Sequence, residues 1–303
     1  MDGIASAPAQ AVVSNFQANC AVCGGPLAAR PRVRVSEACL LECSSCGSWT
    51  YWPRQSPSGQ QSLHDSADYF DHPYFELRRR ISPSLRRRCR QTFARIGRAL
   101  DVGSLRGQPL LDVGCDTGVF LQCAAEEFGV KPIGLDVARR SVEQARQAGM
   151  EVYQAPLDQA PEHLRGLPLI LAIDLIEHVP DPGAFLREIR GRLRSGGAAY
   201  LETPNIESKV YRLGSWLSAL SGGRPAALYD RLFPPQHVQY FTRQSFIALA
   251  QKNGLQIVSV ETRSLPGGDI AASSLVRLGM GVVQALDALS GSHILICAVL
   301  RRE

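Results

Sequence analysis

The sequence predicts an α/β protein: a doubly wound sheet of seven strands, preceded by a zinc ribbon and carrying a helical lid. Short apolar runs alternate with amphipathic helical stretches from residue 109 to the C-terminus, a rhythm typical of right-handed βαβ units. Two Cys-x-x-Cys pairs lie near the start of the chain. A stretch with Trp216, a Gly222-Gly223 pair and Pro234-Pro235 interrupts the rhythm between 205 and 240 and is expected to be the lid.

Size and composition narrow the class of protein. The 303 residues, 45% of them apolar, are enough for a large core and suggest about two domains. No run reaches the ~18 apolar residues of a membrane-spanning helix, and the start has no signal-peptide pattern. Residues 1–16 are small and polar, and we expect a disordered tail there. Nine cysteines suit a secreted disulfide framework poorly, so we expect a cytoplasmic protein.

Residues 17–54 are predicted to form the zinc ribbon. Its metal ligands are expected to be the thiolates of Cys20, Cys23, Cys43 and Cys46, because 19 residues separate the two pairs and glycines follow each pair. Four thiolates leave no open coordination position, so the zinc is expected to be structural. An iron site and chance pairs of free cysteines are the alternatives. We expect the ribbon core to be separate from that of the main domain.

Residues 55–104 are predicted to contain a linker and an arginine-rich helix. Residues 55–61 are rich in serine, proline and glycine, and a helix is expected from about 83 to 100. Nine arginines and one acid between Glu76 and Arg98 give a local charge of +8, which leaves −3 for the rest of a chain whose total is +5. This helix is interpreted as a solvated face, a homodimer contact or an RNA footprint. Only one aromatic residue, Phe93, lies among these arginines, which argues against nucleic acid.

The main domain, 105–303, begins with a candidate cofactor turn. A strand, a tight turn and a helix start follow one another from Leu110 to Gly118, an arrangement in which backbone amides approach a ligand. Asp136 ends the next strand, at a distance that suits an acid binding both ribose hydroxyls of an adenosine. A dinucleotide fingerprint would need glycine at positions 116 and 119, where this chain has Asp116 and Val119.

From 105 to 303 the chain resembles the class I S-adenosylmethionine-dependent methyltransferases, whose first motif is an acidic strand followed by Gly-x-Gly-x-Gly. In that family the segment matching Asp112–Gly118 wraps the methionine part of the cofactor, and the acid matching Asp136 binds its ribose. The segment around Asp158 matches the adenine contact, and residues 172–182 match the fourth strand and its following turn. The resemblance therefore implies cofactor-binding roles for Asp112, Gly114, Asp116, Gly118, Asp136, Asp158 and Asp174.

The order of segments extends the resemblance to nearly the whole chain. A zinc ribbon, an aromatic stretch from 68 to 75 and the segment from 237 to 242 together resemble a bacterial subgroup that acts on sugars, glycans or other metabolites. In these relatives the aromatic stretch packs over the cofactor, which implies that Tyr69 and Tyr74 touch it. The alternative is that these rings only anchor the linker.

Asp116 departs from the family pattern because it replaces the middle glycine. Aspartate tolerates left-handed backbone angles better than most residues, so we expect the turn to form. Its carboxylate either lies near the cofactor or points away from it. A degenerate fold that does not bind cofactor is the alternative.

Two histidines are catalytic candidates. Methyl transfer to a hydroxyl needs in-line positioning and a base, and we expect His178 at the carboxyl edge of the sheet and His237 in the lid to lie where ligands bind. Packing is the alternative role for each. Asp174-x-x-Glu177-His178 also resembles an arrangement with which a few methyltransferases hold a cation, so magnesium or manganese is a second hypothesis.

Together these features predict a biosynthetic methyltransferase that uses S-adenosylmethionine to methylate an oxygen of a small metabolite or sugar. RNA methylation through the arginine-rich helix and a catalytically inactive binding module are the alternatives. The residue types of the lid and linker do not identify the acceptor.

Overall fold

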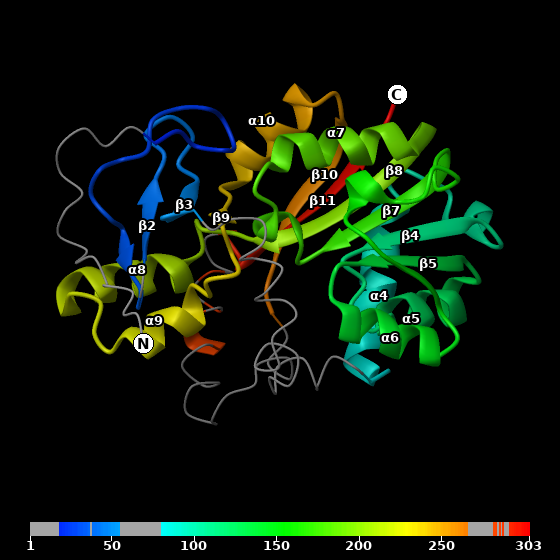
Figure 1. The fold of residues 1–303 in the computed structure, drawn as a ribbon, viewed down its shortest axis with the longest axis horizontal. Coiled ribbons are helices and arrows are strands. Elements are labelled where there is room, and N and C mark those ends of the chain that lie inside the picture. Colours follow the sequence, from blue (N-terminus) through cyan, green and yellow to red (C-terminus); the bar gives the residue numbers. More distant parts are fainter. Residues whose placement is uncertain are drawn as a thin grey trace, which may run out of the picture.

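The computed structural model describes residues 18–54 except Glu37, residues 80–265, and residues 281–303 except 284, 286 and 288–290. The predicted tail 1–16, nearly all of the linker, and Tyr69 and Tyr74 in the aromatic stretch lie outside the described residues. Figure 1 shows two parts, a large layered α/β part and a smaller part built on the N-terminal strands. No described helix has the length and apolar character needed to cross a membrane.

A seven-stranded sheet forms the larger part, as the sequence predicts, in the order β10-β11-β8-β7-β4-β5-β6. The strands from β4 to β8 pair in parallel, whereas β11 runs antiparallel to β8 and β10. Within this sheet, β11 is therefore the strand that runs against the others. The strands are β4 (Pro109–Val113), β5 (Lys131–Asp136), β6 (Glu151–Gln154), β7 (Leu167–Ile173), β8 (Leu193–Pro204), β10 (Gln256–Arg263) and β11 (Leu295–Arg301).

Helices cover both faces of this sheet (Figure 1). One face carries α4 (Pro83–Ile96), α5 (Val119–Phe128) and α6 (Arg139–Gln147), and the other carries α7 (Pro182–Arg192) and α10 (Arg243–Lys252). Burial on both faces explains why the central strands are continuous apolar runs. Single turns of 3₁₀ helix lie at Val102–Leu105, Leu157–Gln159 and Ile176–His178.

The arginine-rich helix α4 belongs to the sheet's covering layer. It starts where Ser82 accepts a hydrogen bond from the Leu85 amide and Pro83 occupies the first turn. Its buried face includes Cys89 and Phe93, and Phe93 stacks on Phe128 of α5 with ring centroids 3.9 Å apart. The helix therefore contributes to the core of the main domain.

Most arginines of this segment that the structure describes are paired within the chain. Five of them contact acids of other elements: Arg86 and Arg90 with Glu127, Arg95 and Arg98 with Glu261, and Arg88 with Asp174 and Glu202. Acids of other elements thus neutralise much of the positive charge that the sequence concentrates in this segment. The exposed pairs contribute little to stability, because water and salt screen them.

The smaller part is a four-stranded antiparallel sheet in the order β1-β2-β3-β9. The N-terminal segment supplies β1 (Val33–Arg34), β2 (Cys39–Glu42) and β3 (Trp49–Trp52), and the predicted lid supplies β9 (Gln239–Tyr240). The lid also supplies α8 (Lys209–Ser221) and α9 (Ala226–Leu232), which lie against β1. The ribbon and the expected lid therefore form one structural unit (Figure 1).

The expectation of separate cores was wrong. Cys20, Leu41 and Cys43 of the ribbon belong to the same buried cluster as Phe246 of α10 and the apolar residues of the large sheet. Polar contacts reinforce this junction, since Ser48 Oγ donates to Ser245 Oγ at 2.8 Å. The junction forms because the chain after β9 runs directly into α10, beneath the cysteine loops.

Candidate active site

The candidate site lies where the carboxyl ends of β4, β5 and β7 meet. The chain passes from β4 to β5 on one side and later returns to pair β7 with β4 on the other. Ligands of open α/β sheets bind at such a reversal of strand order. The sequence-predicted turn, residues 114–118, follows β4 at this place.

The turn adopts the strained backbone that its glycines permit. Gly114 has φ 75°, and a Cβ there would lie 3.0 Å from Leu175 Cδ1. Gly118, with φ 75°, precedes the first turn of α5. Asp116 takes φ 48°, as expected for an aspartate in a left-handed position, and its carboxylate accepts a hydrogen bond from Ser141 Oγ at 2.8 Å. The carboxylate is thus directed toward α6.

Asp136 and the turn are one hydrogen-bonded unit. Its Oδ2 accepts from the Asp116 amide and its Oδ1 from the Ala138 amide, each at 2.8 Å. Burial raises the pKa of Asp136 to about 6, although these amides oppose the rise. A carboxylate has about four lone-pair sites, so these two hydrogen bonds do not saturate it.

Asp112 supplies a buried carboxyl group at the end of β4. Its Oδ1 has no hydrogen-bond partner among the described residues. Burial, together with the negative charge of Asp136, raises the pKa of Asp112 to about 8. Asp112 therefore offers a buried oxygen with no partner among the described residues, next to a glycine turn whose space a Cβ at Gly114 would fill. Both features fit the S-adenosylmethionine that the sequence implies.

Asp174 follows β7 in a left-handed conformation, with φ 54°. Arg88 of α4 joins it to Glu202 of β8, through Nη2 at 3.2 Å from Asp174 Oδ2 and 2.6 Å from Glu202 Oε1. Burial disfavours ionised Glu202, but the guanidinium groups of Arg88 and Arg263 outweigh it, and the pKa of Glu202 is lowered to about 2. Asp158, by contrast, is exposed on the turn after β6.

The two catalytic candidates lie side by side. The rings of His178 and His237 have centroids 4.8 Å apart, and His178 Nδ1 lies 2.9 Å from the Gln236 carbonyl oxygen. Fully buried Glu177 joins them, with one ligand atom from each of the three residues within 4.8 Å of the others. Thr203 Oγ1 donates to Glu177 Oε2 at 2.9 Å, and Oε1 has no hydrogen-bond partner within the described part of the chain.

This grouping differs from the triplet that the sequence indicates for a cation. Asp174 is paired with Arg88 instead, and His237 takes its place beside Glu177 and His178. Burial and the nearby Asp174 carboxylate hold the pKa of Glu177 well above its usual range. The sequence interpretation missed Arg88, Glu202 and Arg263. A glutamate at the end of an otherwise apolar strand was the available sign that buried cations face it.

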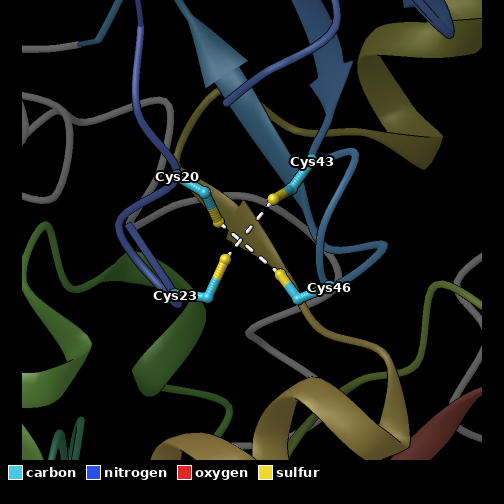
Figure 2. Close-up of side chains that lie close together, drawn as sticks. All are labelled: Cys20, Cys23, Cys43 and Cys46. Atoms are coloured by element: carbon cyan, nitrogen blue, oxygen red, sulfur yellow. Dashed lines mark hydrogen bonds between the residues drawn. The ribbon is translucent and has the colours of Figure 1, made fainter. Parts of the chain in front are cut away.

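The four predicted zinc ligands converge. Figure 2 shows their sulfur atoms directed toward a common centre between the two cysteine loops. The Cys20 and Cys46 sulfurs are 3.8 Å apart and the Cys23 and Cys43 sulfurs 3.4 Å apart, close to the ~3.8 Å edge of a tetrahedron with Zn–S bonds of about 2.3 Å. The Gly25 amide donates to Cys23 Sγ at 3.3 Å. Cys39, in β2, lies outside this group.

The sheet order, the glycine turn and the acid after β5 define a class I methyltransferase. The chain belongs to the methyltransferase domain family, whose profile matches residues 77–260, more than half of its length and including α4. The protein is therefore an S-adenosylmethionine-dependent methyltransferase, which confirms the predicted class, fold and enzyme type.

Curated relatives include ubiquinone biosynthesis O-methyltransferases. The protein of Bordetella avium is 28% identical over 51% of this chain and 68% of its own length, and that of Leptothrix cholodnii is 26% identical over 58% and 79%. Among solved structures, phosphoethanolamine N-methyltransferase 2 of Haemonchus contortus, in complex with S-adenosyl-L-methionine, has a TM-score of 0.54 at 16% identity. That match covers 84% of this chain and 62% of the other and shows the fold alone.

Proposed function

We propose that this enzyme methylates a hydroxyl oxygen of a small metabolite or sugar. The observation that carries the proposal is the His178–His237 pair, which lies just beyond Asp174 at the same sheet edge as the glycine turn. Histidine is the commonest base for removing a hydroxyl proton. The curated relatives, named as O-methyltransferases, favour the same acceptor atom.

The cofactor site is proposed on the residues that the family resemblance marks. The turn from Asp112 to Gly118 holds the methionine part, Asp136 the ribose and Asp158 the adenine, with Asp174 at the rim. Tyr69 and Tyr74, which lie outside the described residues, are proposed to contact the cofactor, as the family resemblance implies. S-adenosylmethionine, when bound, supplies an electrophilic methyl group. The chain positions the acceptor hydroxyl in line and excludes water.

His237 is the proposed general base, with His178 beside it. It would accept the proton that the acceptor hydroxyl loses when the methyl group passes from the sulfonium sulfur to the oxygen, which breaks the sulfur–carbon bond and leaves S-adenosylhomocysteine. Buried Glu177, which accepts a hydrogen bond from Thr203, lies within 4.8 Å of both histidines through one ligand atom of each. A divalent metal is the second candidate, because one carboxylate and two imidazoles within 4.8 Å are a ligand set for magnesium, manganese or zinc.

A chelator separates the base from the metal, because His237 and Glu177 belong to both arrangements. If His237 is the base, His237→Ala should lower turnover by ~10²- to 10⁴-fold and leave cofactor affinity nearly unchanged. If a metal acts, a chelator that spares the cysteine-bound ion should abolish activity, added magnesium or manganese should restore it, and Glu177→Gln should mimic the chelator. Full activity in His237→Ala together with indifference to the chelator would contradict both, leaving positioning as the only catalytic device.

The cysteine cluster is proposed to hold one structural zinc ion. The sulfur separations and the closed four-thiolate set support it. This zinc leaves no position for substrate, so its role is to fix the cysteine loops against α10 and β9.

Labelled S-adenosylmethionine tests the acceptor class. The enzyme is incubated with labelled cofactor and a bacterial extract, which is then separated into small molecules, RNA and protein. We expect label among the small molecules, where mass spectrometry identifies the product. Label in RNA would support the alternative based on the arginine-rich helix. No transfer and no binding of S-adenosylhomocysteine would indicate an inactive binding module.

A cytoplasmic location and a homodimer stay predictions.

A further inference from the structure

Helix α8 presents four large apolar side chains to solvent. They are between 40% and 66% exposed and recur at helical spacing, and together they form the α8 stripe: Leu213, Trp216, Leu217 and Leu220. The central positions of the buried side are small, Gly214 and Ser218. A surface helix normally turns its apolar stripe to the core. An exposed stripe of this kind marks a surface that another molecule covers.

The orientation of α8 is fixed by contacts on its buried side. The Arg34 amide donates a hydrogen bond to Ser218 Oγ at 3.2 Å, which satisfies a backbone group of β1. A small residue is needed one turn earlier, because a Cβ at Gly214 would collide with Leu232 of α9. The helix therefore cannot turn the α8 stripe inward without breaking its contacts with β1 and α9.

A groove of about 740 Å³ runs beside the α8 stripe, between α8, the cysteine ribbon and the start of α10. Trp216 belongs to both features, since it is the stripe residue that also lines the groove. A contact across a two-fold axis uses the same patch on both copies, so one surface must carry a projecting group and a recess. The exposed indole and the groove meet this requirement.

Opposite charges line the groove without pairing with each other. Arg212 is exposed and has no ion pair among the described residues. Glu207 accepts a hydrogen bond from the Arg243 amide at 2.9 Å, but it too has no ion pair within the part of the chain that the structure describes. A two-fold axis through the groove would bring Arg212 of each copy to Glu207 of the other. An anionic membrane surface would instead repel this carboxylate.

We propose that the α8 stripe and the groove beside it form a self-complementary interface between two copies of this chain. Trp216 of each copy enters the groove of the other, and the leucines of the stripe pack around the two-fold axis. Arg212 and Glu207 form two ion pairs at the groove. The dimer contact is thus on α8, and not on the arginine-rich helix α4.

Sedimentation velocity of the full-length chain tests the interface at about 1–100 µM, a range that detects micromolar dissociation constants. We expect the wild type to reach twice the 33.0 kDa of one chain. Leu220→Glu and Trp216→Glu should each weaken the dimer about 30-fold or more, the effect of losing a residue at an interface centre. Arg87→Glu, on an exposed position of α4 far from α8 (Figure 1), is the control and should leave the dimer unchanged.

An exchange of charges tests whether the partner is a second copy. Arg212→Glu alone and Glu207→Arg alone each place like charges across the axis twice, so each should weaken the dimer about 10-fold or more. Mixing the two variants restores both ion pairs. A mixed dimer should therefore form with nearly the wild-type affinity.

Other outcomes would overturn the proposal. A wild type that stays monomeric at ~100 µM has no such interface, and binding of that monomer to phosphatidylglycerol vesicles would assign the α8 stripe to a membrane surface. A dimer that withstands both glutamate substitutions on α8 while circular dichroism shows them folded, or one that Arg87→Glu disrupts, would place the contact elsewhere. Charge variants that do not associate when mixed would contradict the two-fold arrangement.

Discussion

Asp116 illustrates how one residue can depart from a family pattern without losing the local structure. The position needs a left-handed backbone, which glycine adopts freely and aspartate adopts at a modest cost. Ser141 Oγ donates a hydrogen bond to this carboxylate, so the charge is directed away from the centre of the turn. The sequence could predict the turn from the residue types, but the direction of the carboxylate depends on α6, which no local pattern encodes.

Asp136→Ala tests the ribose assignment. The substitution should remove two charge-assisted hydrogen bonds to the ribose and the hydrogen bond that Asp136 accepts from the Asp116 amide. The affinity for S-adenosylhomocysteine should therefore fall by roughly 30- to 1,000-fold, or about 2–4 kcal/mol. Calorimetry measures this directly, with the exposed Glu143→Ala on α6 as control. Unchanged affinity would show that the ribose lies elsewhere.

Asp112→Asn tests the pH dependence of stability. Since the pKa of Asp112 is raised to about 8 in the folded state and is about 3.9 in an unfolded chain, the unfolded carboxyl binds fewer protons between these values. The folded wild type should therefore lose stability as pH rises from about 4 to 8, and the asparagine variant lacks this loss.

Urea unfolding without cofactor at pH 5 and pH 8 measures the effect. Relative to the wild type, the free energy of unfolding of Asp112→Asn should be higher at pH 8 than at pH 5. Glu143→Gln, an exposed substitution, should show no such shift. A difference that stays constant between the two pH values would mean that Asp112 is ionised throughout this range.

At the scale of elements, the pairing of β3 with β9 explains why the ribbon and the expected lid act together. β9 has only two residues and lies in a segment rich in proline and glycine, so it has no periodic pattern to predict it. Its place is set by β3, far away in the sequence. The same pairing positions His237, two residues before β9, against His178. Sequence reasoning could identify both histidines but not their contact.

Cys43→Ser tests how far the zinc ribbon supports its neighbours. One equivalent of zinc should be present in the wild type and absent from the variant by elemental analysis. Structural zinc contributes ~10–16 kcal/mol in isolated fingers, so its loss should unfold the ribbon. Because Cys43 is buried in the shared core and Thr242 Oγ1 donates to the Cys46 carbonyl, β9 and the start of α10 should also lose hydrogen-exchange protection.

The large sheet should remain protected in Cys43→Ser, since β4 to β8 have their own helices on both faces. Cys39→Ser is the matched control, because Cys39 lies outside the four-sulfur group and its loss should leave the zinc bound. The absence of metal from wild type purified without chelator would remove the zinc proposal. Unchanged exchange in β9 would restore the expectation of an independent ribbon.

At the scale of the whole molecule, the sequence predicts the large sheet well and the junctions poorly. Seven apolar runs with turn residues between them are local signals, and each became a strand. The antiparallel direction of β11 and the continuous core depend on contacts between distant segments. Arg88 was missed for a similar reason, because nine neighbouring arginines look alike until the fold buries one of them.

The final prediction concerns α4 and the unity of the fold. Phe93 is 1% exposed and stacks on Phe128, and Arg95 ties the same helix to Glu261 of β10. Phe93→Ala should therefore lower the free energy of unfolding by about 3–5 kcal/mol, while the exposed Arg87→Ala should stay within about 0.5 kcal/mol. Fluorescence and circular dichroism during urea unfolding should show one coincident transition, shifted to lower urea. If α4 only linked two domains, Phe93→Ala would leave the urea midpoint for unfolding of the large sheet unchanged. That outcome would contradict the placement of α4 in the methyltransferase core.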